Sequence, residues 1–357
     1  MSEPVITLQA PAGPDLAFTR AEVLPGRGMT TLQVRARVPG LGEVDVIASP
    51  PLEEARARFD RGSRGPFPGN ESYLFGGAVL IPYANRIRGL LSQDGRTIRA
   101  RIPGGEVALP ANAGGRPGAE QYSMHGLVLD AKVGEIERRT TSEEDAVSGT
   151  LHAGDFGGRW LSKAEISFEN ILRGNSFTVR ITVRNAGREI LPMGIGWHPY
   201  FNVPSLRREQ ARLYVPARRR TLVNDYDETL PTGEVVSVAG TPYDFSMPGG
   251  RAMGDLFLDD CFVDLEAPAG EVTAEVADPA SGYGLRVVAA APPVRAIQVY
   301  APPDKPFIVV EPQSNWADPF GEQWGPDVDT GMARLAPGES VTYQARLELF
   351  RPPRTSP

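Results

Sequence analysis

The chain has 357 residues, of which 41% are apolar and 23% are charged, and these are ordinary values for a globular protein. A net charge of −7 and an isoelectric point near 5.3 argue against a nucleic-acid partner, because phosphate backbones attract basic surfaces. The single cysteine, Cys261, excludes an intrachain disulfide and is compatible with a reducing compartment.

The first residues contain neither the basic segment nor the apolar stretch that is typical of a secretory signal. No window approaches the roughly 20 consecutive apolar residues that a membrane-spanning helix requires. We therefore expect a cytoplasmic protein that has no membrane partner.

Alternation of apolar and polar residues dominates the chain and predicts half-buried antiparallel strands. Residues 31–38 carry apolar side chains at every even position, from Leu32 to Val38. Residues 52–60 begin with acids and carry arginines later, which suits the helix dipole and predicts one short helix. The alternation returns at residues 178–184 and 341–349, where the odd positions are apolar or aromatic.

The organisation of the chain favours an all-β protein. There are 39 glycines and 34 prolines, as expected of a chain rich in turns. We find no alternation of strands with helices, no sequence repeat and no linker. The sequence therefore predicts one all-β domain over residues 1–357, with an ordered core over about residues 5–352, built as a large antiparallel β-sandwich.

Polar residues that could contact a ligand first appear after the apolar residues 80–84. Asn85 and Arg86 can together clamp vicinal hydroxyls, because the guanidinium is a planar fork of donors. A pair of surface residues is the commoner interpretation of such a motif alone. His125 precedes Gly126, and this motif alone is more typical of a histidine in a surface turn than of a ligand.

His198 lies in the segment GIGWHPYFN, residues 194–202, and is one of only three histidines. The glycines permit close backbone approach, and Pro199 favours an extended backbone at His198. The aromatic neighbours could form a wall that faces a sugar. The alternative is a core histidine with a satisfied hydrogen bond.

Three more polar residues stand in or beside strand-like segments. Asp259 is compatible with a hydroxyl acceptor or with an exposed acidic turn, and an inward-facing Gln298 needs a partner, which a ligand can supply. Glu311 follows four apolar residues. A carboxylate at the end of a buried strand requires hydrogen bonds or a shifted pKa, so Glu311 is a candidate general base unless it lies in solvent.

No metal-binding or nucleotide-binding motif is present. The chain lacks HExxH, CxxC and EF-hand patterns, and it also lacks GxGxxG and the P-loop. We therefore expect neither a metal nor a cofactor.

Taken in chain order, these residues resemble the aldose 1-epimerase (galactose mutarotase-like) family. The matching segments are residues 82–87 with Gly89, residues 125–126, residues 198–202, Asp259 with Phe262, residues 298–300 and residues 311–313. Pro312 after Glu311, Trp197 before His198 and the short stretch from Gln298 to Glu311 are most similar to the broad bacterial branch of the family.

The resemblance implies the galactose mutarotase-like supersandwich, with the site in an open cleft on one sheet. It implies that an aldose is converted between its α and β anomers, with Glu311 as general base and His198 as general acid. The implied ligands of the sugar hydroxyls are Asn85, Arg86, His125, Asp259 and Gln298. This chemistry calls for a protonated His198 and an ionised Glu311, and positive charge on Arg86 would help to keep Glu311 ionised.

Two alternatives use the same motifs. A hexose-6-phosphate 1-epimerase would need a basic pocket, for which Arg86, Arg88 and the arginine run 218–220 are candidates. A non-catalytic carbohydrate-binding protein could also use this fold, because a fold does not fix a function. We expect a monomer or homodimer whose partner is a small sugar.

Overall fold

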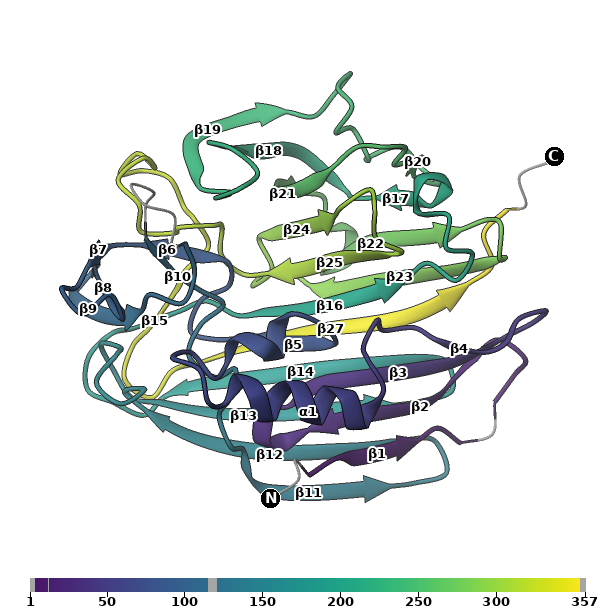
Figure 1. Cartoon of the computed structure of the whole chain (residues 1–357), viewed down its shortest axis with the longest axis horizontal. Coiled ribbons are helices and arrows are strands. Elements are labelled where there is room, and N and C mark those ends of the chain that lie inside the picture. The colour runs from purple at the N-terminus through teal and green to yellow at the C-terminus, as the bar shows by residue number, and fades with distance from the viewer. Residues whose placement is uncertain (1–3, 12, 115–120, 354–357) are drawn as a thin grey trace.

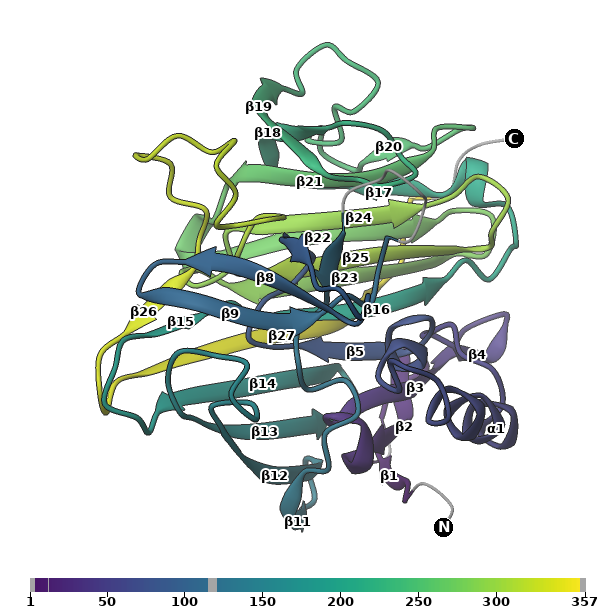
Figure 2. The ribbon, with the colours of Figure 1, turned by 60° about the vertical axis from the view of Figure 1, so that its left-hand side comes forward.

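Two large antiparallel β-sheets pack face to face and form the body of the protein (Figures 1 and 2). The structure is a computed structural model that describes residues 4–11, 13–114 and 121–353. Within these residues, one sheet has eleven strands and the other has nine. The predicted all-β antiparallel sandwich is therefore confirmed.

The order of strands in the eleven-stranded sheet brings distant parts of the chain together. Its strands are, in order, β1 (Ile6–Gln9), β2 (Ala17–Leu24), β3 (Thr30–Val38), β5 (Gly77–Leu80), β16 (Gly196–Asn202), β25 (Phe307–Gln313), β24 (Ala296–Ala301), β21 (Leu258–Leu265), β18 (Ala217–Val223) and β19 (Pro231–Ser237), and β4 (Gly42–Asp45) pairs with β3. The four central strands from β16 to β21 position the site described below.

The nine-stranded sheet covers one face of the first. Its strands are, in order, β11 (Gly134–Thr140), β12 (Asp145–Gly154), β13 (Ala164–Leu172), β14 (Ser176–Asn185), β27 (Ser340–Phe350), β23 (Tyr283–Ala290), β22 (Glu271–Asp278), β17 (Arg212–Tyr214) and β20 (Arg251–Ala252). The predicted strands at residues 178–184 and 341–349 are β14 and β27, which pair with each other.

Smaller elements complete the fold. The additional strands are β6 (Arg86–Arg88) with β10 (Tyr122–Met124), β15 (Leu191–Met193) with β26 (Ala333–Leu335), and the three-stranded group β7 (Leu90–Leu91), β8 (Thr97–Ile102) and β9 (Gly105–Pro110). The helices are α1 (Leu52–Gly62) and the 3₁₀ turns Pro25–Arg27, Asn70–Tyr73, Arg208–Gln210 and Pro268–Gly270. No helix in the described part of the chain is long and apolar enough to cross a membrane.

The helix α1 confirms the short helix predicted at residues 52–60, and its position explains one wrong prediction. Phe59 of α1 packs with Leu24 and Leu32, whereas Val34 belongs to the core between the sheets. The pairing of β2 with β3 shifts register beside Leu32. This irregularity turns Leu32 to the face opposite Val34, although strict alternation predicted a shared face.

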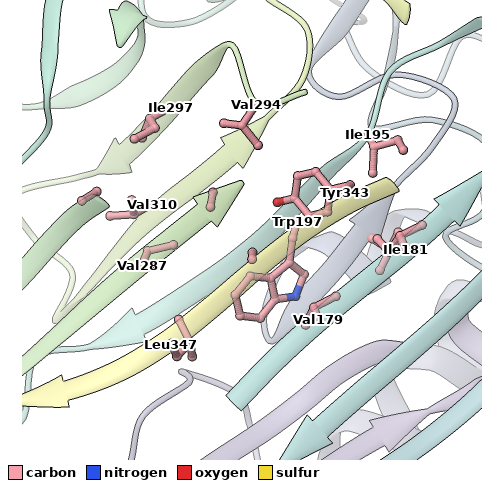
Figure 3. Close-up of a cluster of buried hydrophobic side chains, with 14 of the residues drawn as sticks. Val179, Ile181, Ile195, Trp197, Val287, Val294, Ile297, Val310, Tyr343 and Leu347 are labelled. Atoms are coloured by element: carbon pink, nitrogen blue, oxygen red, sulfur yellow. The ribbon is translucent and has the colours of Figure 1, made fainter. Parts of the chain in front are cut away.

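The core between the sheets is aliphatic and aromatic, and Trp197 lies at its centre (Figure 3). Its ring is fully buried, and its Nε1 donates a hydrogen bond of 3.2 Å to the carbonyl oxygen of Gly77. A side chain at Gly77 would place its Cβ 2.7 Å from that same nitrogen, so the two strands approach closely here. Because side chains alternate along β16, burying Trp197 inward turns His198 to the outer face of the sheet.

We expect Trp197→Ala to lower the free energy of unfolding by about 3–5 kcal/mol, because it removes a buried indole and leaves a cavity between the sheets. Urea denaturation followed by circular dichroism measures this loss. The matched control is Leu206→Ala, because the side chain of Leu206 is 73% exposed and its removal should have little effect. Equal losses in the two variants would contradict the placement of Trp197 in the core.

Candidate active site

Three adjacent strands place an imidazole, a carboxyl and an amide in one row on the outer face of the eleven-stranded sheet. Gln298 of β24 lies directly opposite Glu311 of β25. On the other side, His198 of β16 falls between two residues that pair with Gln313 and Val309, so it lies beside Glu311. The Nε2 atom of His198 is 3.5 Å from Oε2 of Glu311.

The loop that follows β5 and the turn that follows β10 bring two more predicted residues, Asn85 and His125, to this row. The backbone N–H of His125 donates to the carbonyl oxygen of Asn85 over 2.9 Å, and β6 pairs with β10 beside them. Both residues have left-handed backbones, with φ of +61° at Asn85 and +64° at His125. Such values are uncommon outside glycine and gather at functional sites.

Gly126 is required next to this pair. Its φ is +80°, and a Cβ there would lie 2.2 Å from the carbonyl oxygen of Ile81. Only glycine therefore permits the turn that presents His125 to the sheet.

Four of the predicted ligand residues form a closed ring of polar contacts. Nη1 of Arg86 donates to Oδ1 of Asn85 (2.9 Å), and Nδ2 of Asn85 donates to Oε1 of Gln298 (3.1 Å). Nε2 of Gln298 then donates to Oδ1 of Asp259 (2.6 Å), and Nη2 of Arg86 lies 3.8 Å from Oδ2 of the same carboxylate. The polar ring (Asn85, Arg86, Asp259 and Gln298) is thereby held in place before any ligand binds.

All seven predicted site residues line one cavity of about 300 Å³. The structure thus brings together His198, Glu311, His125 and the whole polar ring. The remaining lining residues, which the sequence did not indicate as ligands, are Tyr73, Leu74, Met124, Tyr200, Tyr226, Asp227, Thr229 and Tyr300. Tyr200 and Tyr300 follow His198 and Gln298 by two positions, so strand alternation alone places them on the same face.

The loop at residues 224–230 closes one side of the cavity and is anchored to two adjacent carboxylates of β21. Oγ1 of Thr229 donates to Oδ2 of Asp259 over 3.1 Å. The hydroxyl of Tyr226 donates to the buried carboxylate of Asp260 over 3.1 Å. Asp260 also accepts a hydrogen bond of 2.5 Å from Arg220.

The arginine run at residues 218–220 is distributed over three ion pairs. Arg218 pairs with Glu266 at 3.0 Å, Arg219 with Asp264 at 3.2 Å, and Arg220 with Asp260. Each guanidinium already faces an acid, so this run does not form the basic pocket that a phosphosugar would need.

Burial dominates the electrostatics of Glu311. The residue is 0% exposed, and neither carboxyl oxygen has a hydrogen-bond partner among the described residues. Loss of hydration raises the pKa of Glu311 well above its usual value, and the negative charge of Asp259 raises it further. Arg86 acts in the opposite direction but does not reverse the shift.

Burial keeps both site histidines neutral. It lowers the pKa of His198 to about 4, and the positive charge of Arg86 contributes to the decrease. The pKa of His125 is also lowered, first by burial and then by His198 and Arg86. Both shifts run against the charges expected from the sequence, because desolvation outweighs the influence of Arg86 on Glu311 and favours its protonated form, and it favours the neutral form of His198.

Within residues 4–11, 13–114 and 121–353, no group of three or more histidine, cysteine, aspartate or glutamate residues could hold a metal ion. His152 lies outside the cluster, on the surface, where its Nε2 is 3.2 Å from Glu135.

Comparison with known proteins gives concordant matches. The family model described as aldose 1-epimerase matches residues 66–348. The uncharacterized protein YphB of Escherichia coli K12 is 26% identical over 279 residues, which cover 76% of this chain and 82% of that one.

Solved structures share the fold at low sequence identity. A galactose mutarotase-like protein from Clostridium acetobutylicum has a TM-score of 0.73 and 17% identity, covering 98% of this chain and 99% of that one. The GalM/aldose epimerase homologue from C. elegans has a TM-score of 0.72 and 18% identity, with the same coverage.

We expect Glu311→Gln to stabilise the protein increasingly as the pH rises from about 4 to 8. A carboxyl whose pKa is raised by folding contributes stability below its unfolded pKa, near 4.3, and loses that contribution as the pH rises through its folded pKa. Glutamine has no proton to lose, so the difference in Tm between variant and wild type should grow with pH. Differential scanning calorimetry across this range measures it.

The matched control for this comparison is Glu43→Gln, because the side chain of Glu43 is 54% exposed. A Tm difference for Glu311→Gln that stays constant, or that shrinks with increasing pH, would contradict the burial of an unpartnered carboxyl at this position.

Proposed function

The chain belongs to the aldose 1-epimerase family, and we propose that its cavity interconverts the α and β anomers of a free aldose by opening and reclosing the sugar ring. The family membership confirms the resemblance carried by the sequence motifs. The proposal depends above all on one observation: the buried carboxyl of Glu311, with both oxygens unpartnered among the described residues, lies 3.5 Å from His198 in a cavity lined by hydroxyl-binding side chains.

The reaction needs one base and one acid at opposite sides of the hemiacetal. Glu311 removes the proton of the anomeric hydroxyl while His198 protonates the ring oxygen, and the bond between C1 and the ring oxygen breaks. Rotation about the C1–C2 bond of the resulting aldehyde exposes its other face. The reverse transfers then close the ring as the other anomer and restore both residues, so atoms and protons balance.

Glu311 and His198 together hold a single proton, and the binding of a sugar determines which of the two residues carries it. In the empty cavity, burial leaves it on Glu311. A bound sugar donates its anomeric hydroxyl to a Glu311 oxygen and offers its ring oxygen to Nε2 of His198. Both contacts favour the charged forms, so the proton can move across the 3.5 Å from Oε2 to Nε2 without exchange with solvent.

The polar ring has a positioning role in this scheme. The open aldehyde must stay bound while one of its bonds rotates, and the remaining hydroxyls are what the protein can hold. Arg86, Asn85 and Gln298 present donors, and Asp259 presents an acceptor. His125 lies edge-on to His198 with ring centroids 4.9 Å apart, close to the reacting end of the sugar.

A free sugar fits the charges of the cavity better than a 6-phosphate. Among the described lining residues, Arg86 is the sole arginine or lysine, and it already faces Asp259. Asp227 and Glu311 add further carboxyl groups. A purely binding role would not call for an unpartnered buried carboxyl, which is unfavourable for folding.

We expect Glu311→Gln to reduce the catalysed rate to background and His198→Asn to reduce it at least tenfold, because each positioned proton transfer contributes about 10²–10⁴-fold. Proton NMR exchange between anomers, over a panel of aldoses, gives the rates. Sugar binding should survive in Glu311→Gln, since the polar ring is intact.

Matched controls are His152→Asn and Glu43→Gln, whose side chains are more than half exposed in the native protein. Wild-type turnover in Glu311→Gln would refute Glu311 as the base. A loss below tenfold in His198→Asn would assign the acid role to another group.

The pH dependence of kcat/KM should show an acidic limb near pH 4 rather than near 6.5. Below about pH 4, His198 gains a proton while Glu311 keeps its own, and no base remains. As the pH rises through the elevated pKa of Glu311, the pair loses its single proton and no acid remains. The test measures the catalysed rate at each pH after subtraction of the rate of the Glu311→Gln variant. An acidic limb of the kcat/KM profile at pH 6.5 would contradict a buried, neutral His198.

A further inference from the structure

The outer face of the eleven-stranded sheet carries side chains in rows that cross its central strands. The first row holds Gln298 together with Glu311 and His198, which we call the catalytic pair of the proposed function. Two residues further along each strand, the second row consists of Tyr200, Val309, Tyr300 and Asp259. Another two residues along, Phe307 of β25 lies opposite Asn202. Because a strand rises about 3.3 Å per residue, successive rows are about 7 Å apart.

Aromatic rings continue from the cavity into this third row. The ring of Tyr300, which lines the cavity, lies 6.1 Å from that of Phe307 and 6.2 Å from that of Phe257. These three rings are only partly buried. We call Phe257, Tyr300 and Phe307 the aromatic patch, and Tyr300 makes it continuous with the cavity.

The side of the patch next to the 224–230 loop is held rigidly. The ring of Tyr226 lies 5.0 Å from that of Phe257, and the Tyr226 hydroxyl is bonded to buried Asp260. Arg220, which also pairs with Asp260, stacks its guanidinium 3.6 Å from the centre of the Tyr243 ring. A patch fixed in this way loses little entropy when a ligand packs on it.

We propose that the aromatic patch is a second subsite, which binds the neighbouring sugar ring of a reducing oligosaccharide while the reducing-end aldose occupies the cavity. This inference rests on the proposed function. The patch lies one to two rows from Glu311, which corresponds to a distance of roughly 7–13 Å along the strands. The second ring of a disaccharide would lie at about this distance from the anomeric carbon of the reducing end. Aromatic rings offer an apolar face to the C–H face of a sugar and a polar edge to its hydroxyls.

The charges beside the patch favour a neutral occupant. The short connection between β24 and β25, residues 302–306, contains one basic residue, Lys305, and Nζ of Lys305 pairs with Asp304 at 3.0 Å. A phosphorylated extension would therefore meet balanced charge here, whereas a glycosyl extension meets three aromatic rings.

The test compares KM for glucose, maltose and cellobiose in the wild type, Phe257→Ala and Phe307→Ala, by NMR anomer exchange. In the wild type, at least one disaccharide should have a lower KM than glucose. Both variants should raise the ratio of that disaccharide's KM to the glucose KM by about threefold to tenfold, as expected for the loss of one aromatic contact. Circular dichroism confirms that the variants fold.

The matched control is Phe350→Ala, because Phe350 is also partly buried but lies on β27 of the other sheet, over Arg286. The ratio of KM values should not change in this variant. The second subsite does not exist if, in the wild-type protein, both disaccharides have KM values equal to or above that of glucose. The same conclusion follows if the patch variants leave the ratio of KM values unchanged.

A binding measurement separates this inference from the proposed function. Methyl β-cellobioside and methyl β-glucoside have no free anomeric hydroxyl, so their titration by calorimetry needs no turnover. Tighter binding of the cellobioside, weakened in Phe257→Ala, supports the subsite even if no aldose is epimerised. Normal epimerisation of glucose with equal binding of the two glycosides overturns the subsite and leaves the proposed function standing.

Discussion

Glu311 stands at the centre of a large sheet with its carboxyl group removed from water and without a hydrogen-bond partner among the described residues. Such a group is tolerated only when it stays neutral or when a ligand completes its contacts. The neighbouring imidazole of His198 is also buried, and burial favours a protonated carboxyl beside a neutral imidazole. A sugar hemiacetal supplies one donor and one acceptor, which are the groups that this pair lacks. In the proposed function, this unfavourable burial is the source of the selectivity for a hydroxyl next to a ring oxygen.

In the proposed function, different residues carry out the chemistry and hold the substrate. Three hydrogen bonds link the four side chains of the polar ring, so these side chains hold one another in place. The catalytic pair has almost no such support from polar neighbours and is positioned instead by strand register and by the packing of Trp197 on the opposite face. A reaction in which one end of the substrate rotates while the rest stays bound benefits from this separation.

Much of this arrangement could be predicted from the sequence, because strand alternation and short motifs are local signals. Alternation predicted β14 and β27 with their inward faces, and the motifs identified seven residues that line one cavity. The face of Leu32 was wrong, because a register irregularity in one strand leaves no local signal. Burial also shifts the pKa values of Glu311 and His198 against the charges that we expected, and burial is a property of the assembled sheets that the sequence does not show.

Of the eight lining residues that the sequence did not reveal, half lie outside regular strands and helices, namely Leu74, Tyr226, Asp227 and Thr229, and their omission has a physical basis. Residues on strands are fixed by backbone pairing, so their relative positions follow from register. Tyr226 and Thr229 reach the cavity only because two consecutive carboxylates of β21 anchor their loop from either side. A change of length or sequence in that loop would alter the wall that meets the sugar and leave the distance between His198 and Glu311 unaffected. In the proposed function, the sheet therefore fixes the positions of the acid and the base, while changes in the loops can alter which sugar is bound.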